Sequence, residues 1–554
     1  MKVKVHHNGD DVFIAWKPDG FIKDCRGFAL LRRRNGVEEV VSTWVGFENQ
    51  PHKLGERRAS TNWPIQKYQW TDYMAKPGDK LRYRVVPMVG PDKDNLTAET
   101  SLASAWTPEV TLDHEVAPGL EVYFNRGIVA SQWVSRRLGI TDTNKQTAKL
   151  ARIIDTPDDP FRNYLMGPLG ARLFELLDEA NKKKRHIYAA LYELDDVQLQ
   201  AALKKFGKRA HVVLANGSVK KKGDDQNADA RADLDGKVDL HDRMVSPKAL
   251  GHNKFLVICE TGNESPRWVW TGSQNWTKTG LCTQANNSVL IDSKPFAAEY
   301  RKQWDLLRDA GDETPDTLKK SNSKVRVHEA GNHDTRLWFT PTIGQVDLNE
   351  AKKLIMAAED AILFLMFNPG PKDTLLNEII AAARKKHPSK RPYIHGAINQ
   401  DPSTTKTPVE LFDEKNSDSA DFNVVLPAAI DKTTDFWVAE LKKLPKTFAM
   451  VHSKVVLLDP FTNPILLTGS HNLGPKASGI NDENLLIFKG IPELASAYAC
   501  NIMAIYNQYR WRFRTAGQPA AKRWKGLHDD DNWQRGYLRE GTAGLRELDF
   551  WVSG

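Results

Sequence analysis

The first 112 residues consist of short apolar or alternating runs, such as Val12–Trp16 and Leu81–Val86, separated by turn-rich segments. Residues two apart in a strand point to the same face of a sheet, so such runs predict short strands with one buried face. Several of them in succession, with a turn signal between each pair, predict a small all-β sandwich over residues 1–112.

The pattern changes after a linker at residues 113–119. From residue 120 onwards, apolar strand-like runs alternate with amphipathic helical segments. This alternation is typical of βαβ units, in which helices cover a mixed or parallel sheet. We therefore expect an α/β fold in the larger part of the chain.

This α/β pattern occurs twice. The corresponding segments, in order, are strands at 120–124 and 335–339, helices at 168–183 and 347–359, strands at 187–192 and 361–367, helices at 196–206 and 372–386, and strands at 210–215 and 393–398. Two copies of one fold in a chain can place equivalent loops face to face across a pseudo-two-fold axis. We expect two pseudo-symmetric halves, residues 120–325 and 335–514, packed face to face.

Two polar insertions and a C-terminal extension complete the pattern. Residues 216–250 and 399–446 are long and polar, and loops of this length are commonly functional, so we expect them at the rim of a substrate cleft. Residues 515–554 contain Trp524, Trp533 and Trp551. Large aromatic side chains are seldom free in solvent, which predicts that this extension packs across the body.

The composition agrees with a soluble globular protein. The 554 residues are 40% hydrophobic and 27% charged, and neither a signal-peptide pattern nor an apolar run of ~18 residues is present. We expect a cytoplasmic protein unless a signal-independent system exports it. The net charge of +8 favours an anionic partner, either nucleic acid or an anionic lipid surface. Four widely spaced cysteines predict buried thiols and neither a zinc site nor a disulfide framework.

The candidate chemistry lies in a motif that follows the last strand of each copy. In the first copy, His252 and Lys254 enclose one residue, and a Gly-Ser-Gln-Asn segment follows with Ser273 and Asn275. Asn286 comes 13 residues after the serine.

The second copy repeats this register. His452 and Lys454 are followed by Gly-Ser-His-Asn with Ser470 and Asn472, and Glu483 again comes 13 residues after the serine. Each copy thus supplies an imidazole, an ammonium, a hydroxyl and an amide at one place. Two such copies face to face can surround a single phosphate.

These groups suit cleavage of a phosphodiester without a metal ion. The anionic oxygens of a phosphodiester repel nucleophiles, so fixed positive charge and hydrogen-bond donors have to stabilise the reacting group. One imidazole can attack phosphorus to form a phosphohistidine while the other protonates the leaving oxygen. We expect neither a metal nor a cofactor.

Residues 120–554 resemble the phospholipase D superfamily, whose signature is His-x-Lys-x4-Asp with a following Gly-Ser-x-Asn. The resemblance implies a phosphodiesterase in which both motif lysines, asparagines and serines bind the phosphate. The signature Asp is present as Asp459, where the resemblance implies a structural role, but Cys259 replaces it in the first copy. Residues 1–112, with Trp16 and Tyr83, are similar to fibronectin type III modules, which implies a positioning or protein-binding role.

The two copies differ at the last motif position, where the superfamily places a partner of a catalytic imidazole. A carboxylate partner raises the pKa of an imidazole, whereas an amide does so weakly. We expect Glu483 to pair with His452 and hold it protonated as the general acid. Asn286 then orients the more readily neutral His252, which is the expected nucleophile.

The motifs do not choose among phosphodiesters. The basic charge, the polar insertions and the segment Gly-Ser-Gln-Asn-Trp-Thr, similar to the nuclease branch of the superfamily, favour nucleic acid as substrate. A phospholipase or phosphatidyl transferase acting at a bilayer is the alternative, although no amphipathic interfacial helix is evident. A non-catalytic scaffold that holds phosphate is a second alternative. Trp276 is expected in the core and not as a base-stacking residue.

Overall fold

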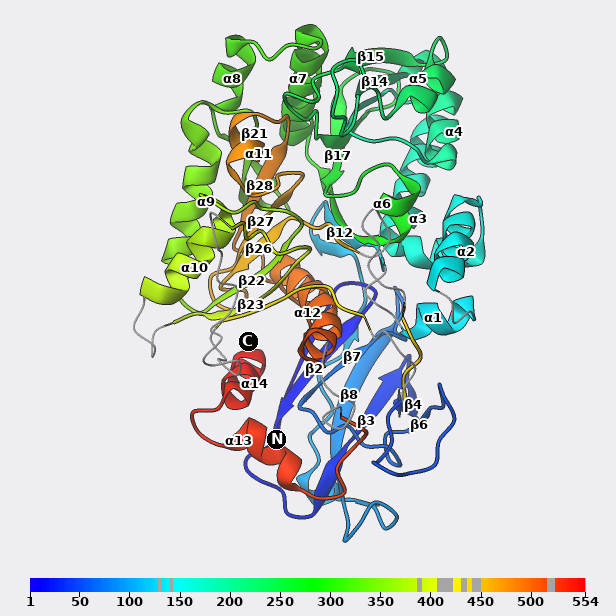
Figure 1. Ribbon diagram of the computed structural model, residues 1–554, viewed down its shortest axis with the longest axis vertical. Coiled ribbons are helices and arrows are strands. Elements are labelled where there is room, and N and C mark those ends of the chain that lie inside the picture. Colours follow the sequence, from blue (N-terminus) through cyan, green and yellow to red (C-terminus); the bar gives the residue numbers. More distant parts are fainter. Residues whose placement is uncertain are drawn as a thin grey trace.

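The computed structural model describes residues 1–127, 132–139, 143–385, 391–405, 422–429, 436–440, 450–515 and 524–553. Figure 1 shows three sheet-containing parts, with the N-terminal strands at one end of the molecule and two α/β parts at the other. The N- and C-terminal ends lie close together beside the N-terminal strands.

The N-terminal part consists of two antiparallel sheets. One has the order β1 (Lys2–His7), β2 (Val12–Lys17), β7 (Gln69–Asp72), and the other has the order β10 (Val110–Thr111), β8 (Lys80–Val89), β3 (Cys25–Arg34), β4 (Val37–Val40). β9 (Thr97–Ala98) pairs with β8, and β5 (Ser42–Thr43) pairs with β6 (Arg58–Ala59). Trp16 and Tyr83 are fully buried. This confirms an all-β N-terminal region, whereas its likeness to fibronectin type III stays a prediction.

The two α/β parts have the same strand order. The first sheet runs β11 (Glu115–Ala117), β12 (Leu120–Phe124), β19 (Asn287–Asp292), β17 (Pro266–Gly272), β16 (Lys254–Cys259), β13 (Ile187–Leu191), β14 (Ala210–Ala215), β15 (Asp239–Arg243). The second runs β20 (Arg326–Ala330), β21 (His333–Phe339), β28 (Asn484–Lys489), β27 (Ile465–Gly469), β26 (Val455–Leu458), β22 (Ala361–Met366), β23 (Tyr393–Ile398), β24 (Phe422–Val425). Both sheets are mixed, with the last three strands of each order parallel to one another. The predicted fold class is confirmed.

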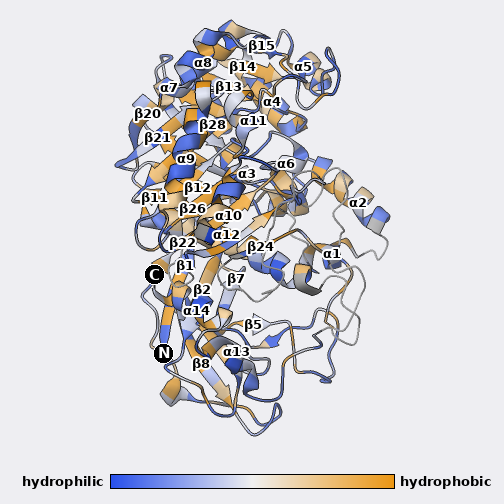
Figure 2. Cartoon of the chain, turned by 60° about the vertical axis from the view of Figure 1, so that its left-hand side comes forward, coloured by the Kyte–Doolittle hydropathy of each residue, from blue (hydrophilic) through white to orange (hydrophobic). Residues whose placement is uncertain are grey.

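Helices pack on both faces of the two sheets. Those of the first half are α1 (Gln132–Leu138), α2 (Thr143–Asp155), α3 (Pro160–Lys182), α4 (Val197–Phe206), α5 (Ala228–Leu234), α6 (Lys278–Cys282), α7 (Lys294–Ala310) and α8 (Asp316–Asn322). The second half has α9 (Val346–Ala357), α10 (Leu375–Lys385), α11 (Pro475–Gly479) and α12 (Pro492–Thr515). α3 begins earlier than predicted because Asp159 caps it and Pro160 stands at its first turn. Figure 2 shows hydrophobic colours mainly on the strands and hydrophilic colours on the outer helices and loops.

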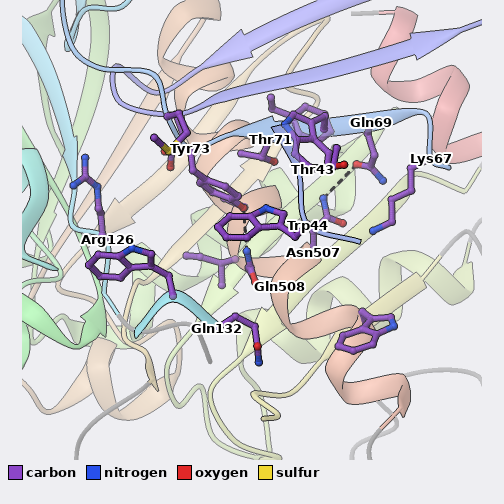
Figure 3. Close-up of a pocket in the computed structure, with 18 of the residues that line it drawn as sticks. Thr43, Trp44, Lys67, Gln69, Thr71, Tyr73, Arg126, Gln132, Asn507 and Gln508 are labelled. Carbon is purple, nitrogen blue, oxygen red and sulfur yellow. Dashed lines mark hydrogen bonds between the residues drawn. The ribbon is translucent and has the colours of Figure 1, made fainter. Parts of the chain in front are cut away.

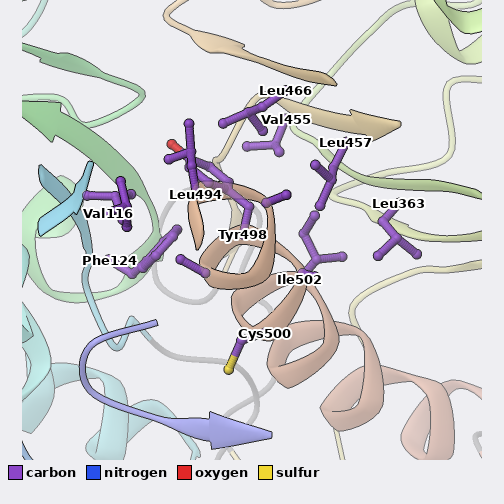
Figure 4. Packing of buried hydrophobic residues seen from close by; sticks show 14 of the residues in the cluster. Val116, Phe124, Leu363, Val455, Leu457, Leu466, Leu494, Tyr498, Cys500 and Ile502 are labelled. Atoms are coloured by element: carbon purple, nitrogen blue, oxygen red, sulfur yellow. The ribbon is translucent and has the colours of Figure 1, made fainter. Parts of the chain in front are cut away.

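α12 joins the three sheets. It contacts strands of the N-terminal part and of both halves. Figure 4 shows Leu494, Tyr498 and Ile502 of this helix facing Val455 and Leu466 of the second sheet. Cys500 lies on another side of the helix, and its Sγ is 3.6 Å from the carbonyl oxygen of Asp11. All four cysteines are free and buried, as the sequence predicted.

The C-terminal extension contains α13 (Arg535–Leu538) and α14 (Ala543–Ser553) and packs on the N-terminal part. Trp533 Nε1 donates to the carbonyl oxygen of Cys25 at 3.0 Å, and the Trp551 ring lies 4.7 Å from that of Phe13. These two tryptophans therefore pack across the body, as expected.

Residues 216–250, predicted to lie at a cleft rim, include regular structure that the sequence pattern did not predict. They contain α5 and β15, which adds an edge strand to the first sheet. The missed strand is polar because an edge strand buries only part of its surface. In residues 399–446 the described part contains the equivalent edge strand β24, and the rest of that prediction falls outside the described residues. Among the described helices, none is long and apolar enough to cross a membrane.

Candidate active site

The two His-x-Lys segments lie at equivalent places on the two sheets. β16 begins at Lys254 and β26 begins directly after Lys454, so His252 stands two residues before its strand and His452 three residues before its strand. Each Gly-Ser-x-Asn segment begins at the last residue of the neighbouring strand, because β17 ends at Gly272 and β27 at Gly469. The sequence predicted this arrangement.

Crossed hydrogen bonds hold the two halves face to face. Thr271 Oγ1 donates to Asn484 Oδ1 at 3.2 Å, and Asn287 Nδ2 donates to Thr468 Oγ1 at 2.9 Å. These two contacts are equivalent under the pseudo-two-fold axis. Each joins a threonine near the end of β17 or β27 to the asparagine that begins β28 or β19 of the other half. β18 (Gln284–Ala285) of the first half also pairs in parallel with β25 (Met450–Val451) of the second.

The imidazoles of the two His-x-Lys motifs receive their partners from the opposite half. Nδ1 of His252 lies 3.4 Å from Oε2 of Glu483, while Nδ1 of His452 lies 2.8 Å from Oδ1 of Asn286. The expected pairing of Glu483 with His452 is therefore wrong. Because the halves pack face to face, Glu483 and Asn286 each point toward the histidine of the other copy. The sequence spacing within one copy cannot reveal this.

Glu483 is held in a fixed orientation. Its Oε2 accepts a hydrogen bond from the backbone N–H of Asn472 at 2.9 Å, and its Oε1 accepts from Asn481 Nδ2 at 3.0 Å. The carboxylate is fully buried, which raises its pKa, but His252 and these donors outweigh burial and leave the pKa below its usual value. Glu483 thus remains an anion beside His252.

The two lysines are buried and mutually repulsive. Nζ of each donates to the carbonyl oxygen of the histidine two residues earlier, at 2.7 Å for Lys254. Lys254 Nζ lies 4.8 Å from the ring centroid of Tyr192, and Lys454 Nζ lies 4.8 Å from that of Phe367. Burial lowers the pKa of both lysines, and the charge of Lys254 lowers that of Lys454 further. An anion between them would relieve this repulsion, so the site is suited to phosphate.

The motif amides and hydroxyls have distinct contacts. Asn275 Nδ2 donates to Glu193 Oε2 at 2.6 Å, whereas Asn472 contacts Glu483 through its backbone. Ser273 Oγ donates to Asn286 Oδ1 at 2.8 Å, and Ser470 Oγ accepts from the N–H of Asn484 at 3.0 Å. Both serine hydroxyls therefore hold neighbouring polar groups in place, and the phosphate contact implied by the sequence stays a prediction.

Glu193 belongs to the site but escaped the sequence analysis. It stands two residues after the end of β13 and lies close enough to both motif lysines to raise their pKa. Burial raises its own pKa. The strand pairing places Glu193 where the second half has Asn368, so an alignment of the two copies by their strands would have identified this third difference between them.

Asp459 lies at the far end of β26 from Lys454. Its carboxylate accepts hydrogen bonds from the backbone N–H groups of Glu359, Asp360 and Ala361 at 2.7 to 3.1 Å. These contacts fix the chain just before β22, so they agree with a structural role. Cys259 at the equivalent place is buried and uncharged.

Burial and the neighbouring lysines disfavour the charged form of both motif imidazoles. Burial and the two lysine charges lower the pKa of His252 to about 4, even though Glu483 acts in the opposite direction. The pKa of His452 is lowered well below its usual value for the same reasons, without a carboxylate partner. The site therefore offers nucleophilic nitrogen atoms next to cations, a set of groups suited to an anionic electrophile.

Comparison with known proteins supports this assignment. Residues 173–307, which include His252 and Lys254, match the family model described as the phospholipase D-like domain of cardiolipin synthase. No curated protein matches the chain.

Solved structures with a similar fold share little sequence. The polyphosphate kinase of Porphyromonas gingivalis is 12% identical with a TM-score of 0.37, over 57% of this chain and 45% of the kinase. The chain thus spans less than half of that protein. The phosphatidylserine synthase of Haemophilus influenzae Rd KW20 is 12% identical with a TM-score of 0.40, over 61% and 84%. The yeast tyrosyl-DNA phosphodiesterase is 14% identical with a TM-score of 0.31, over 57% and 85%. The family model alone makes residues 173–307 similar to a phospholipase D-like domain, the type of domain that the first His-x-Lys motif predicted.

Proposed function

We propose that the chain is a phosphodiesterase that works through a phosphohistidine on His252, with His452 as the general acid and without a metal ion. The crossed pairing of the two imidazoles carries this proposal. Each Nδ1 atom is engaged by the opposite half, so each Nε2 atom remains for chemistry on a phosphate held by Lys254 and Lys454.

The roles of the two histidines follow from their partners. As Nε2 of His252 bonds to phosphorus, its ring becomes cationic, and the carboxylate of Glu483 stabilises that charge, as the aspartate of a Ser-His-Asp triad stabilises its imidazolium. His452 has only an amide partner, so its imidazolium is the stronger acid. The negative charge of the bound substrate offsets the lysines and favours protonation of His452 before the reaction.

The reaction balances over two steps. The phosphorus–oxygen bond to the leaving group breaks as the nitrogen–phosphorus bond forms, and His452 donates its proton to the leaving oxygen. His452 then removes a proton from water, the water oxygen attacks phosphorus, and His252 leaves. Ser273 and Ser470 act as positioning residues in this scheme, and Asn275 and Asn472 bind phosphate oxygens.

An alkaline quench followed by mass mapping of the peptides tests the role of His252. We expect phosphate on His252 in the wild type and no phosphate after His252→Ala. With a substrate whose leaving group needs no protonation, His452→Ala should accumulate the phosphohistidine, because only the second step then requires His452. Phosphate on His452 would contradict the assignment.

For the substrate, we propose nucleic acid, with a single strand bound in a cavity beside the active site. The cavity has a volume of about 1190 Å³ and lies among the N-terminal part, the first half, α12 and the C-terminal extension. Figure 3 shows Trp44, Tyr73 and Arg126 around this space. Other lining residues include Arg57, Lys67, Trp133, Arg136, Trp511 and Trp524. Aromatic rings on which bases stack, interleaved with cations for phosphates, are typical of single-strand binding sites.

The cavity is joined to the catalytic centre by hydrogen bonds. Asn125 lines the cavity, and its Oδ1 accepts from the backbone N–H of Asn286 at 2.8 Å. The side chain of Asn286 in turn contacts His452. Trp276 is 1% exposed and belongs to the core, so it takes no part in this binding.

Cleavage assays in EDTA with single-stranded DNA, RNA, plasmid and mixed liposomes test the substrate. We expect cleavage of nucleic acid that is lost in His252→Ala and His452→Ala. The alternative, a phospholipase or phosphatidyl transferase, is favoured by the description of the matching family model. Release of choline or phosphatidic acid would support that alternative, and phosphate binding without turnover would support the non-catalytic scaffold.

The N-terminal part is proposed to be a fibronectin type III-like module that also offers a surface for a protein partner. The proposal is supported by the arrangement of three and four main strands in its two sheets, with strands β1, β2 and β7 facing β10, β8, β3 and β4.

A further inference from the structure

We propose that the first half carries a zinc site made by His186, His211 and Glu264, at the end of the sheet opposite the active site. In β13, Leu191 pairs with Lys254 of the active site, while Ile187 at the other end pairs with Ile258. His186 directly precedes Ile187. The site is thus separate from the proposed phosphodiesterase chemistry and does not rest on it.

Three donor atoms converge at this place. Nδ1 of His186 lies 3.1 Å from Nε2 of His211 and 3.8 Å from Oε1 of Glu264. The three residues offer donor atoms that all lie within 4.8 Å of one another. Ligands of a tetrahedral zinc ion, bonded at ~2.0–2.2 Å, are ~3.3 Å apart, so small side-chain rotations suffice to bind the ion.

Neighbouring groups orient two of the donors. Nδ1 of His211 is 2.6 Å from Oδ2 of Asp239, which favours the tautomer with a lone pair on Nε2, facing His186. This carboxylate–histidine pair is the arrangement that commonly supports zinc-bound histidines. The hydroxyl of Tyr188 donates to Oε2 of Glu264, and the Tyr188 ring stacks on His211 at 4.2 Å.

The type of ion follows from the donors and their exposure. Two imidazole nitrogens and one carboxylate suit zinc, whereas magnesium and calcium prefer oxygen ligands. The side chains of His186 and Glu264 are 29% and 52% exposed, so the ion can enter from solvent and water can occupy the fourth position.

The site occurs only in the first half among the described residues that correspond by strand pairing. In the second half, Asp459 binds the backbone of residues 359–361, and Ala361 stands at the position that corresponds to His186. The first half has Cys259 in place of that aspartate. A bound zinc ion would therefore fasten the start of β13 at the position where the carboxylate fastens the start of β22.

Calorimetric titration of the EDTA-treated full chain with zinc chloride tests the proposal. We expect one zinc ion per chain and a higher melting temperature on binding. Glu264→Gln, an exposed and conservative change, should weaken binding at least tenfold, and Asp239→Asn should weaken it about 10- to 100-fold. His211→Ala should abolish it. His328→Ala removes a half-exposed histidine beside a single carboxylate, Glu299, and serves as the matched control.

Absence of stoichiometric zinc binding would overturn the proposal. So would unchanged binding in His211→Ala and Glu264→Gln, or loss of binding in His252→Ala, which would place the ion in the active site. Because the cleavage assays contain EDTA, the proposed activity and the zinc site succeed or fail independently.

Discussion

His252 and His452 differ in what their Nδ1 atoms meet. A buried carboxylate faces the first and a buried amide faces the second, and both imidazoles lie beside the same two lysines. At the scale of single residues, this difference supports the division of labour between nucleophile and acid.

Replacement of Glu483 by Gln tests that division. We expect kcat to fall about 10²- to 10⁴-fold, because the cation that forms on His252 loses its carboxylate partner. His252 has to be neutral to attack, so kcat/KM falls as the pH drops through its pKa of about 4. Glu483 raises this pKa, so the acid limb of the pH profile should move to lower pH in Glu483→Gln. The profile of kcat/KM against pH measures both effects.

The matched variant is Asn286→Asp. It gives His452 a carboxylate partner, which raises the pKa of His452 and makes it a weaker acid. We expect a smaller loss of kcat than in Glu483→Gln. Equal effects of the two variants would argue against distinct roles.

Stacking in the cavity is also a property of single residues. The guanidinium of Arg57 lies 3.7 Å from the ring centroid of Trp44, and that of Arg136 lies 5.5 Å from it. If a base stacks here, Trp44→Ala should raise KM for single-stranded substrates about tenfold and leave kcat unchanged, since one stacked base contributes ~1–3 kcal/mol. Trp106→Ala is the control, because Arg33 covers Trp106 at 4.6 Å outside the cavity.

At the scale of elements, α9 holds the loop that follows β27. Asp347 in the first turn of α9 lies 3.0 Å from Nε2 of His471, and both side chains are fully buried. Asp347 also accepts from Thr342 Oγ1 at 2.6 Å. His471 stands between Ser470 and Asn472, so this contact fixes the second Gly-Ser-x-Asn segment.

The Asp347–His471 pair should make stability depend on pH. Asp347 raises the pKa of His471. The contribution of His471 to the free energy of unfolding is therefore complete below pH ~6.5 and is lost as the pH rises through the pKa of His471 in the folded protein. His471 and the hydrogen bonds to Asp347 lower the pKa of Asp347. The contribution of Asp347 to the free energy of unfolding is therefore complete above pH ~3.9 and is lost as the pH falls through the pKa of Asp347 in the folded protein. We expect His471→Gln to be most destabilising between these limits. Urea unfolding at several pH values measures this, and a pH-independent difference would contradict it.

At the scale of the whole molecule, a buried ion pair joins the two halves. Arg243 of β15 donates to Asp482 through Nε at 2.9 Å and through Nη2 at 3.1 Å, and both side chains are almost fully buried. The backbone N–H of Asp482 also donates to the carbonyl oxygen of Leu250 at 2.9 Å. Since Glu483 is the next residue, this junction helps to place the partner of His252.

Removal of one member of this pair should be costly. Arg243→Met and Asp482→Leu should each reduce the free energy of unfolding by ~3–5 kcal/mol, because a buried charge is left without its partner. The double variant should be less destabilised than the sum of the two. An exposed pair provides the control, since Lys182→Met beside Asp178 should cost only ~0–1 kcal/mol. Additive effects of the two buried changes in urea unfolding would show that the pair does not couple the halves.

The sequence predicted the repeated succession of strands and helices and the equivalent positions of the two His-x-Lys segments. Repetition and strand period are local signals, and the strands follow them. The partner of Glu483 could not be predicted, because it depends on how the halves face each other. β15 was missed because Asp239–Arg243 is a polar edge strand, and Glu193 was missed because it belongs to no motif.

The crossed contacts also bear on how variants of this protein can be made. A mutation that tunes the nucleophile belongs in the segment around residue 483, far along the gene from residue 252, and one that tunes the acid belongs near residue 286. Chimaeras that exchange one half for that of a related protein would separate each histidine from the residue that evolved beside it. Successful recombination therefore has to transfer residues 252 and 483 as one unit and residues 286 and 452 as another.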